Sequence, residues 1–169
     1  MRAVVQRVSS ASVAIDGLVV GAIGRGLLVL VGVGQGDTAT DAEYIVEKVA
    51  NLRIFPDGDG RFDRSVIDEA LELLVVSQFT LYGDTRKGRR PSFQGAAAPT
   101  EASTLFEELL ERFRARGLPV ANGRFQAAME VSLVNDGPVT IIIDSDARPG
   151  RHRKRGQSEK GVVLPTLDE

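Results

Sequence analysis

The fold is decided by the stretch LELLVVSQFTLYGD, residues 71–84. Its apolar run from Leu73 to Val76 is rich in β-branched residues, a pattern typical of a strand buried on both faces. Such strands usually end at a turn residue, but this one continues into Ser77-Gln78-Phe79-Thr80 before it reaches Gly83-Asp84. Because a buried polar group without a partner costs about 1–3 kcal/mol, these side chains either satisfy neighbouring backbone or face a ligand.

The sequence on both sides of this strand predicts a sheet that is at least partly antiparallel. Asp16-Gly17 stands between two short β-rich runs, which is a strong hairpin signal. We expect strands in residues 12–23, 26–34, 71–82, 124–134 and 139–144, the last two flanking a predicted turn at 135–138.

Two helices complete the expected pattern. The first begins with a predicted capping box of Thr40 and Glu43, and the second begins at Pro99-Thr100-Glu101 and stops at Gly117. Both carry apolar residues at helical spacing: Ile45, Val46, Val49 and Leu52 in the first, and Leu105, Phe106, Leu109, Leu110 and Phe113 in the second.

The order of these elements predicts one compact α/β domain in residues 1–146, followed by a polar, Arg-rich and flexible tail in residues 147–169. The tail holds six Lys and Arg against three acids, and because the whole chain carries a net charge of −2, the domain carries −5. A mildly acidic domain is unlike a general nucleic-acid binder, so RNA binding would require a local basic patch.

Composition indicates a soluble protein. The chain has 169 residues, 43% of them hydrophobic, which is enough for a real core, and it contains no cysteine. The longest nearly apolar run, residues 26–33, is too short to cross a bilayer, and the first ten residues lack the apolar core of a signal peptide. We therefore expect a cytoplasmic protein with no membrane association.

The single histidine, His152, lies in the basic tail, and this restricts the available chemistry. A Ser-His-Asp or Cys-His arrangement has no plausible base, and a zinc site of the usual His/Cys type has no ligands. We expect no metal and no cofactor. General acid–base catalysis would use a carboxylate, a lysine, a group of the substrate or water.

Two motifs remain as candidate sites, and each has an ordinary structural interpretation. Ser77-Gln78-Phe79-Thr80-Leu81 is also compatible with a strand end whose hydroxyls cap neighbouring backbone. Asn135-Asp136-Gly137-Pro138-Val139-Thr140 is also compatible with a hairpin turn, since Asn, Asp, Gly and Pro are the common turn residues.

Together and in this order, these motifs resemble the D-aminoacyl-tRNA deacylase family. The resemblance covers residues 1–146 in one register, and it rests on QRV at 6–8, VVSQFTL at 75–81, RPSF at 90–93 and VSLVNDGPVT at 131–140. It implies a β/β/α layered homodimer that removes D-amino acids, and mischarged glycine, from tRNA by cleaving the ester at the terminal adenosine.

The resemblance also assigns roles near the strand end. Ser77, Gln78, Phe79 and Thr80 become the catalytic group, with the backbone N–H groups of Phe79 and Thr80 as an oxyanion site. The 2′-hydroxyl of the adenosine is expected to assist attack on the ester. Thr80 has no neighbouring base to activate it, so we expect it to position rather than to attack.

Chiral selection is expected to depend on Gly137 and Pro138. The resemblance implies that these residues form a cis peptide, enter the partner subunit's pocket and capture the amino group of the substrate through backbone carbonyls. Arg7 is expected to brace this loop, and Phe93 and Met129 to contact the substrate. An L side chain would then meet the pocket wall, whereas a D side chain would point into open space.

Contacts to tRNA are expected from the loop DTRKGRRP at 84–91, through Arg86, Lys87, Arg89 and Arg90. The other interpretation of this loop is a solvated charged turn. One departure from the family pattern is Gln126, where small residues are common, and substrate range would differ if its side chain faced the site.

Two other functions stay open on sequence alone. The first is a non-catalytic nucleic-acid-binding protein on the same fold, using the basic tail and the 84–91 loop. The second is a related editing domain that acts on an L-aminoacyl-tRNA. The intact SQFTL and NDGPVT motifs argue against a pure binder, and the chirality of the accepted substrate separates the editing domain from a D-aminoacyl-tRNA deacylase.

Overall fold

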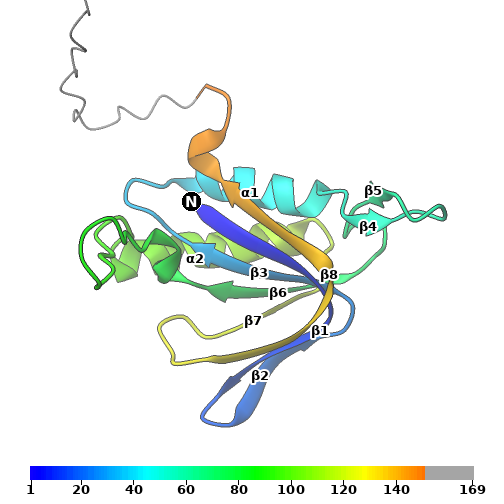
Figure 1. The fold of residues 1–169 in the computed structure, drawn as a ribbon, viewed down its shortest axis with the longest axis horizontal. Helices are drawn as coiled ribbons and strands as arrows, with labels where there is room; N and C mark the ends of the chain where they lie inside the picture. Colours follow the sequence, from blue (N-terminus) through cyan, green and yellow to red (C-terminus); the bar gives the residue numbers. More distant parts are fainter. Residues whose placement is uncertain (151–169) are drawn as a thin grey trace, which may run out of the picture.

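Residues 1–150 are described by the computed structural model, with the elements in the order shown in Figure 1. The strands are β1 (Arg2–Ile15), β2 (Leu18–Ile23), β3 (Gly26–Gly32), β4 (Phe55–Pro56), β5 (Phe62–Arg64), β6 (Glu72–Ser77), β7 (Val120–Asn122) and β8 (Glu130–Asp144). The helices are α1 (Ala39–Asn51), α2 (Pro99–Ala115), and the 3₁₀ turns η1 (Phe79–Tyr82) and η2 (Ser145–Ala147). Most of the predicted tail, residues 151–169, lies outside the described residues.

The long strand β1 organises the main sheet, in which β2, β1, β3, β6 and β7 follow one another and β8 also pairs with β1. The pairs of β1 with β2, β3 and β8 are antiparallel, while β3–β6 and β6–β7 are parallel. The predicted hairpin at Asp16-Gly17 is confirmed, and both residues have the positive φ that such a tight turn requires. The expected mixture of antiparallel and parallel strands is therefore present.

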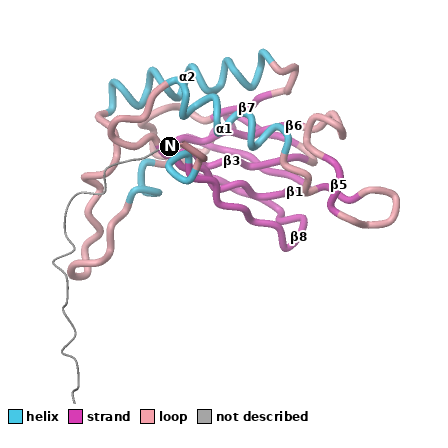
Figure 2. The backbone as a smooth tube through the Cα atoms, turned by 90° about the horizontal axis from the view of Figure 1, so that it is seen from above, coloured by secondary structure: helices cyan, strands magenta, loops and turns pink. Residues whose placement is uncertain are grey.

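Both helices lie on one face of the sheet, as Figure 2 shows from above. The larger core lies between them and the sheet and contains alternate residues of the central strands, such as Val29 and Val75, together with Phe106 and Phe113 of α2. A second core occupies the opposite face and contains Leu74. The central strands are thus buried on both faces, as the unbroken apolar run in β6 predicts.

Several predicted details are wrong. The strand expected over 124–134 begins only at Glu130, because residues 125–126 form a turn. The strand expected over 71–82 ends at Ser77, because residues 79–82 coil into η1. The capping box of α1 is formed by Thr38 and Asp41, two residues earlier than the predicted pair Thr40 and Glu43. The Asp41 carboxylate accepts a hydrogen bond from the Thr38 backbone N–H at 2.9 Å.

The turn expected at 135–138 is not formed, because β8 runs without a break from Glu130 to Asp144. The strand β1 is long enough to pair with both halves of β8. Gln6 pairs with Thr140 and Val8 pairs with Asn135, so the extra residues 136–139 form a bulge opposite Arg7 instead of a hairpin.

No helix among the described residues is long and apolar enough to cross a membrane.

Truncation of Leu74 to Ala should lower the free energy of unfolding by about 2–5 kcal/mol, because this side chain is fully buried in the second core. Leu74→Met nearly conserves the volume and should cost less than about 1.5 kcal/mol. Urea denaturation at one fixed protein concentration measures both values. Equal losses in the two variants would contradict the tight packing of this face.

Candidate functional site

The end of β6 turns sharply away from its neighbour β3. The last paired residues are Val31 and Ser77, and the N–H of Gln78 donates to the Val31 carbonyl at 2.7 Å. The chain then coils into η1, which brings the ring of Tyr82 against Gly34 so closely that a Cβ on Gly34 would lie 2.5 Å from it. Glycine at position 34 therefore allows the turn to close.

Tyr82 is buried behind η1, and its hydroxyl lies 3.4 Å from Oδ2 of Asp37. Burial raises the pKa of the Tyr82 phenol well above its usual range, and the nearby carboxylate of Asp37 raises it further. The phenol therefore stays protonated at neutral pH. Tyr82 supports the turn and is unsuited to act as a base.

The first N–H groups of η1 are free of backbone acceptors. Within the described chain, the N–H groups of Leu81 and Gly83 donate to the carbonyls of Gln78 and Thr80, but no backbone carbonyl accepts from Phe79 or Thr80. Orphan donors are expected in the first turn of any helix. Two adjacent free donors at the end of a strand can stabilise a negatively charged oxygen.

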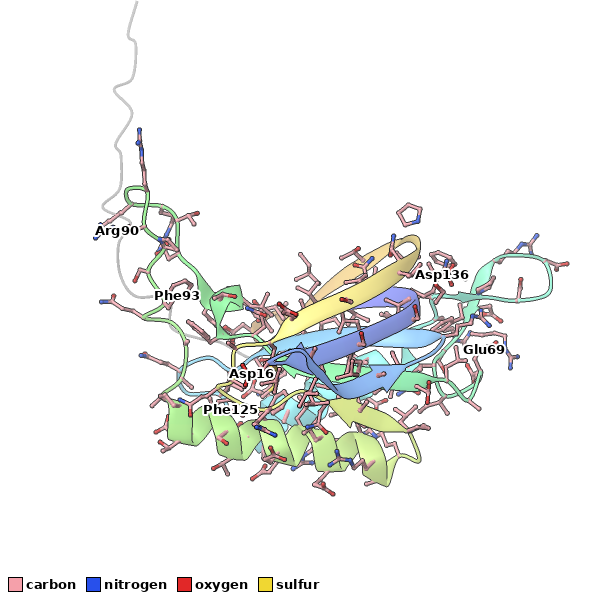
Figure 3. The ribbon with its side chains drawn as sticks, turned by 90° about the horizontal axis from the view of Figure 1, so that it is seen from below. Asp16, Glu69, Arg90, Phe93, Phe125 and Asp136 are labelled. Atoms are coloured by element: carbon pink, nitrogen blue, oxygen red, sulfur yellow. The ribbon has the colours of Figure 1, made fainter. Side chains whose placement is uncertain are left out.

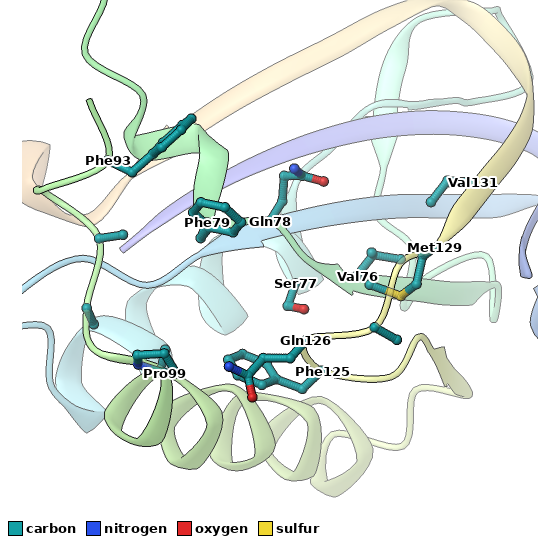
Figure 4. A pocket seen from close by; sticks show the side chains of 14 residues that line it. Val76, Ser77, Gln78, Phe79, Phe93, Pro99, Phe125, Gln126, Met129 and Val131 are labelled. Carbon is teal, nitrogen blue, oxygen red and sulfur yellow. The ribbon is translucent and has the colours of Figure 1, made fainter. Parts of the chain in front are cut away.

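A pocket of about 680 Å³ opens beside these donors (Figure 4). Ser77, Gln78 and Phe79 line one side of it, and Phe93 packs edge-on against Phe79 with ring centroids 5.1 Å apart. Met129 lines the opposite wall. The lining is mostly apolar with a few polar groups at the strand end, which is the usual character of a small-molecule site.

The structure thus brings together five of the residues that the sequence singled out: Ser77, Gln78, Phe79, Phe93 and Met129. Thr80 is absent from the lining of this pocket, and its hydroxyl accepts a hydrogen bond from Nε2 of Gln78. This contact holds the Gln78 amide at the pocket edge. It is consistent with Thr80 as a positioning residue.

Sequence reasoning missed several parts of the wall, namely Ala97, Pro99 and Phe125. Alanine and proline carry no recognisable chemical signal, and they line the pocket only because the segment before α2 passes across its mouth. Gln126 also lines the pocket, with an exposed side chain and a positive φ of 62°. The Gln126 side chain, at the position where this chain departs from the family pattern, therefore faces the site (Figure 4).

Gly137 and Pro138 do not line this pocket, and the peptide bond between them is cis. They are exposed on the bulge of β8, and Figure 3 shows neighbouring Asp136 at the end of the molecule opposite Phe93 and Phe125. Within one chain, the two candidate motifs therefore lie apart.

Arg7 holds this bulge. Its side chain is only 10% exposed, its Nε donates to the Asp136 carbonyl at 2.9 Å, and its Nη1 donates to the carbonyl of Ile54. The Asp136 carboxylate lies 3.3 Å from the same Nε. Arg7 therefore joins the bulge to the segment before β4, and its role in substrate selection stays a prediction.

The basic loop projects from the pocket side of the molecule, with Arg90 at its tip (Figure 3). Asp84 and Ser92 exchange two backbone hydrogen bonds that close the loop. Arg86 is engaged with the Asp84 carboxylate at 2.7 Å, and hydrogen bonds from its side chain and backbone hold the pKa of Asp84 well below the usual range.

The three other cations of this loop make no ion pair with any residue of the described chain: Lys87, Arg89 and Arg90. All three are exposed. They remain available for phosphate contacts.

The chain matches the model of a protein family described as D-Tyr-tRNA(Tyr) deacylase over residues 4–144. It is 61% identical over 145 residues to a D-aminoacyl-tRNA deacylase of Roseiflexus castenholzii, covering 86% of this chain and 92% of that relative. It is 59% identical over 146 residues to a D-aminoacyl-tRNA deacylase of Desulfitobacterium hafniense, covering 86% of this chain and 98% of that relative.

Solved structures share the fold. A c-Myc DNA Unwinding Element Binding Protein superposes with a TM-score of 0.80 at 42% identity, covering 85% of this chain and 98% of its own. A probable eukaryotic D-amino acid tRNA deacylase superposes with a TM-score of 0.73 at 18% identity, covering 84% of this chain and 97% of its own, a likeness that concerns the fold alone.

Replacement of Gly34 by Ala should displace Tyr82 and η1, because the new Cβ would lie 2.5 Å from the phenol ring. The expected result is a lower thermal midpoint together with a changed near-ultraviolet circular dichroism signal. Gly58→Ala is the matched control, since a Cβ there meets nothing within 4 Å. If the two variants behaved alike, close packing of Tyr82 on Gly34 would not control the turn.

Proposed function

This chain belongs to the D-Tyr-tRNA(Tyr) deacylase family, and from its site we propose how it acts as a D-aminoacyl-tRNA deacylase. It is a hydrolase of the ester that joins a D-amino acid to tRNA. We propose that mischarged glycine is also removed, and that the enzyme works in the cytoplasm as a homodimer. The observation that carries the mechanism is the pair of unpartnered N–H groups at the edge of the pocket.

Hydrolysis requires stabilisation of a tetrahedral intermediate. Water adds to the carbonyl carbon of the ester, and the electron pair of the C=O bond moves onto its oxygen. The N–H groups of Phe79 and Thr80 are free to bind that oxyanion. In hydrolases, one such donor stabilises the transition state by about 2.7–4 kcal/mol. The electron pair on the oxyanion then re-forms the C=O bond, the C–O bond to the ribose breaks, and the ribose oxygen takes up the proton that the added water gives up.

The substrate supplies groups that the pocket lacks. No histidine lies among residues 1–150, and the phenol of Tyr82 is protonated. The neighbouring ribose hydroxyl of the terminal adenosine is positioned within the substrate itself and assists proton transfer to the leaving oxygen. Phe79, Phe93 and Met129 give the apolar walls against which the bound nucleoside and amino acid rest.

The site becomes complete when two copies associate. Gly137 and Pro138 are exposed and do not line the pocket, and they follow Asp136, which lies at the side of the molecule opposite Phe93 and Phe125 (Figure 3). They therefore reach a pocket only if it belongs to a second copy. Their carbonyls would bind the α-amino group of the substrate. With the amino group and the ester both fixed, an L side chain points at the wall, whereas a D side chain points outward.

The same strand offers the surface for this association. Along β8, Leu133, Val134 and Ile142 are exposed, with Ile142 at 75%. Leu133 and Val134 are adjacent and point to opposite faces of the sheet, so β8 exposes apolar side chains on both of its faces. Contiguous exposed apolar surface is typical of a protein interface. We propose that this surface packs against its symmetry mate, which brings each bulge to the partner's pocket.

The basic loop at 84–91 lies beside the pocket, and we propose that Lys87, Arg89 and Arg90 contact phosphates of the acceptor end. Such contacts position tRNA without reading its sequence. Arg86 contributes less, because its charge is already offset by Asp84.

The proposed function is tested by deacylation time courses on matched D-tyrosyl-tRNA and L-tyrosyl-tRNA, with and without EDTA. We expect rapid loss of the D ester alone, and no effect of the chelator. Cleavage of the L ester would instead indicate an editing domain for L-aminoacyl-tRNA. Cleavage of neither, with retained RNA binding, would indicate a non-catalytic binding protein.

The composite site is tested with Gly137→Ala, because a Cβ there would lie 2.4 Å from the Val139 nitrogen and reshape the exposed bulge. We expect D/L selectivity to fall while the thermal midpoint changes little. Ala97→Leu, which fills the pocket, should abolish hydrolysis.

Mixing the two variants provides the decisive control. A heterodimer has one intact pocket facing one intact bulge, so random reassembly should return wild-type D/L selectivity to about a quarter of all sites. The mixture should therefore be more selective than Gly137→Ala alone. A mixture no more selective than Gly137→Ala alone, with heterodimers demonstrated by mass spectrometry, would overturn the shared site.

A further inference from the structure

Arg7 touches a third segment besides the bulge and Ile54. Its guanidinium carbon lies 5.3 Å from the centroid of the Phe62 ring, which belongs to β5. This distance is within the range of an attractive cation–π contact. Phe62 is 57% exposed and is absent from both cores of the described chain. Hydrophobic burial therefore does not explain why a large aromatic residue stands at position 62.

The strand that carries Phe62 pairs with β4 at Phe62 itself, opposite Pro56, and is held by side-chain contacts of the two residues that follow. Asp63 pairs with Arg53 at 2.9 Å, and Nη2 of Arg64 donates to the Asp68 carbonyl at 3.0 Å. The β4–β5 hairpin also begins beside Ile54, whose carbonyl accepts from Arg7. The hairpin thus supplies an aromatic ring, and the residue just before it supplies a carbonyl acceptor, to the same guanidinium.

We propose that Phe62 is a positioning residue for chiral selection: its ring covers the guanidinium of Arg7 and thereby keeps the 136–139 bulge in place. The inference rests on the proposed role of Gly137 and Pro138. It extends the selective apparatus to a hairpin that lies outside the pocket and outside both candidate motifs.

The physical reason lies in how a guanidinium forms hydrogen bonds. Its donors point in the plane of the group, toward the Asp136 and Ile54 carbonyls, while its faces remain open to water or to a neighbouring ring. With Phe62 removed, water reaches that face, and Arg7 gains freedom to tilt. The Asp136 carbonyl then loses a fixed donor, and the following two residues lose their position.

The test measures D/L selectivity, as the ratio of kcat/KM for D-tyrosyl-tRNA and L-tyrosyl-tRNA. Phe62→Ala should lower this ratio roughly two- to fivefold, the range that corresponds to one exposed cation–π contact. Phe62→Tyr should retain the ratio because it keeps the ring, whereas Phe62→Leu should not. Ile67→Ala truncates an exposed apolar residue nearby and serves as the matched control.

A double-mutant cycle shows whether Phe62 acts through Arg7. Arg7→Lys should lower the ratio by itself, since lysine cannot span both carbonyls, and Phe62→Ala should then add no further loss. Amide hydrogen exchange over residues 133–140 should be faster in Phe62→Ala than in wild type. That readout is independent of catalysis.

The outcomes separate the two hypotheses. If wild type discriminates and Gly137→Ala does not, but Phe62→Ala keeps the wild-type ratio and exchange rate, the inference on Phe62 is wrong and the proposed function stands. If Phe62→Ala and Arg7→Lys reduce the ratio additively, Phe62 does not act through Arg7. If wild type shows no selectivity at all, the proposed function itself has failed.

Discussion

The near-complete burial of the Arg7 cation is the constraint on which the functional geometry depends. Removing a charged group from water costs several kcal/mol unless hydrogen bonds and an opposite charge replace the solvent. Here the replacements come from β8, through Asp136, and from the segment before β4, through Ile54. Because loss of either partner would leave a buried charge unpaired, β1, the segment before β4 and the bulge of β8 must stay in contact around Arg7.

A second buried charge holds the opposite end of the sheet. The α-ammonium of Met1 pairs with Asp37 at 2.7 Å and donates to Ser145 Oγ at 2.6 Å, and the Tyr82 hydroxyl lies 3.4 Å from the same Asp37 oxygen. This network ties β1 to the support behind η1, next to the pocket. The N-terminal end of β1 therefore supports the pocket, while Arg7 in the middle of β1 supports the bulge. This separation favours a site shared between two copies.

The chemistry of the pocket suits its substrate. Backbone N–H groups, an apolar wall and three polar side chains give moderate stabilisation of an oxyanion without a strong base. An aminoacyl ester is already activated, so moderate catalysis suffices. Selection between D and L substrates then depends on how the amino group and the α-substituent fit. That fit is set by rigid backbone at the end of β6 and in the bulge of β8, more than by any reactive side chain.

The sequence by itself determined the buried strand through Leu73–Val76, though not its end at Ser77, the hairpin at Asp16-Gly17, two amphipathic helices and the order of both motifs. These signals are local: side-chain periodicity, turn residues and short ordered matches. Only the tertiary structure decided that 136–139 is a bulge and no turn, since that depends on the length of β1. It also decided that Ala97 and Phe125 line the pocket and that Phe62 covers Arg7. These contacts join residues far apart in the chain, and no local pattern carries their positions.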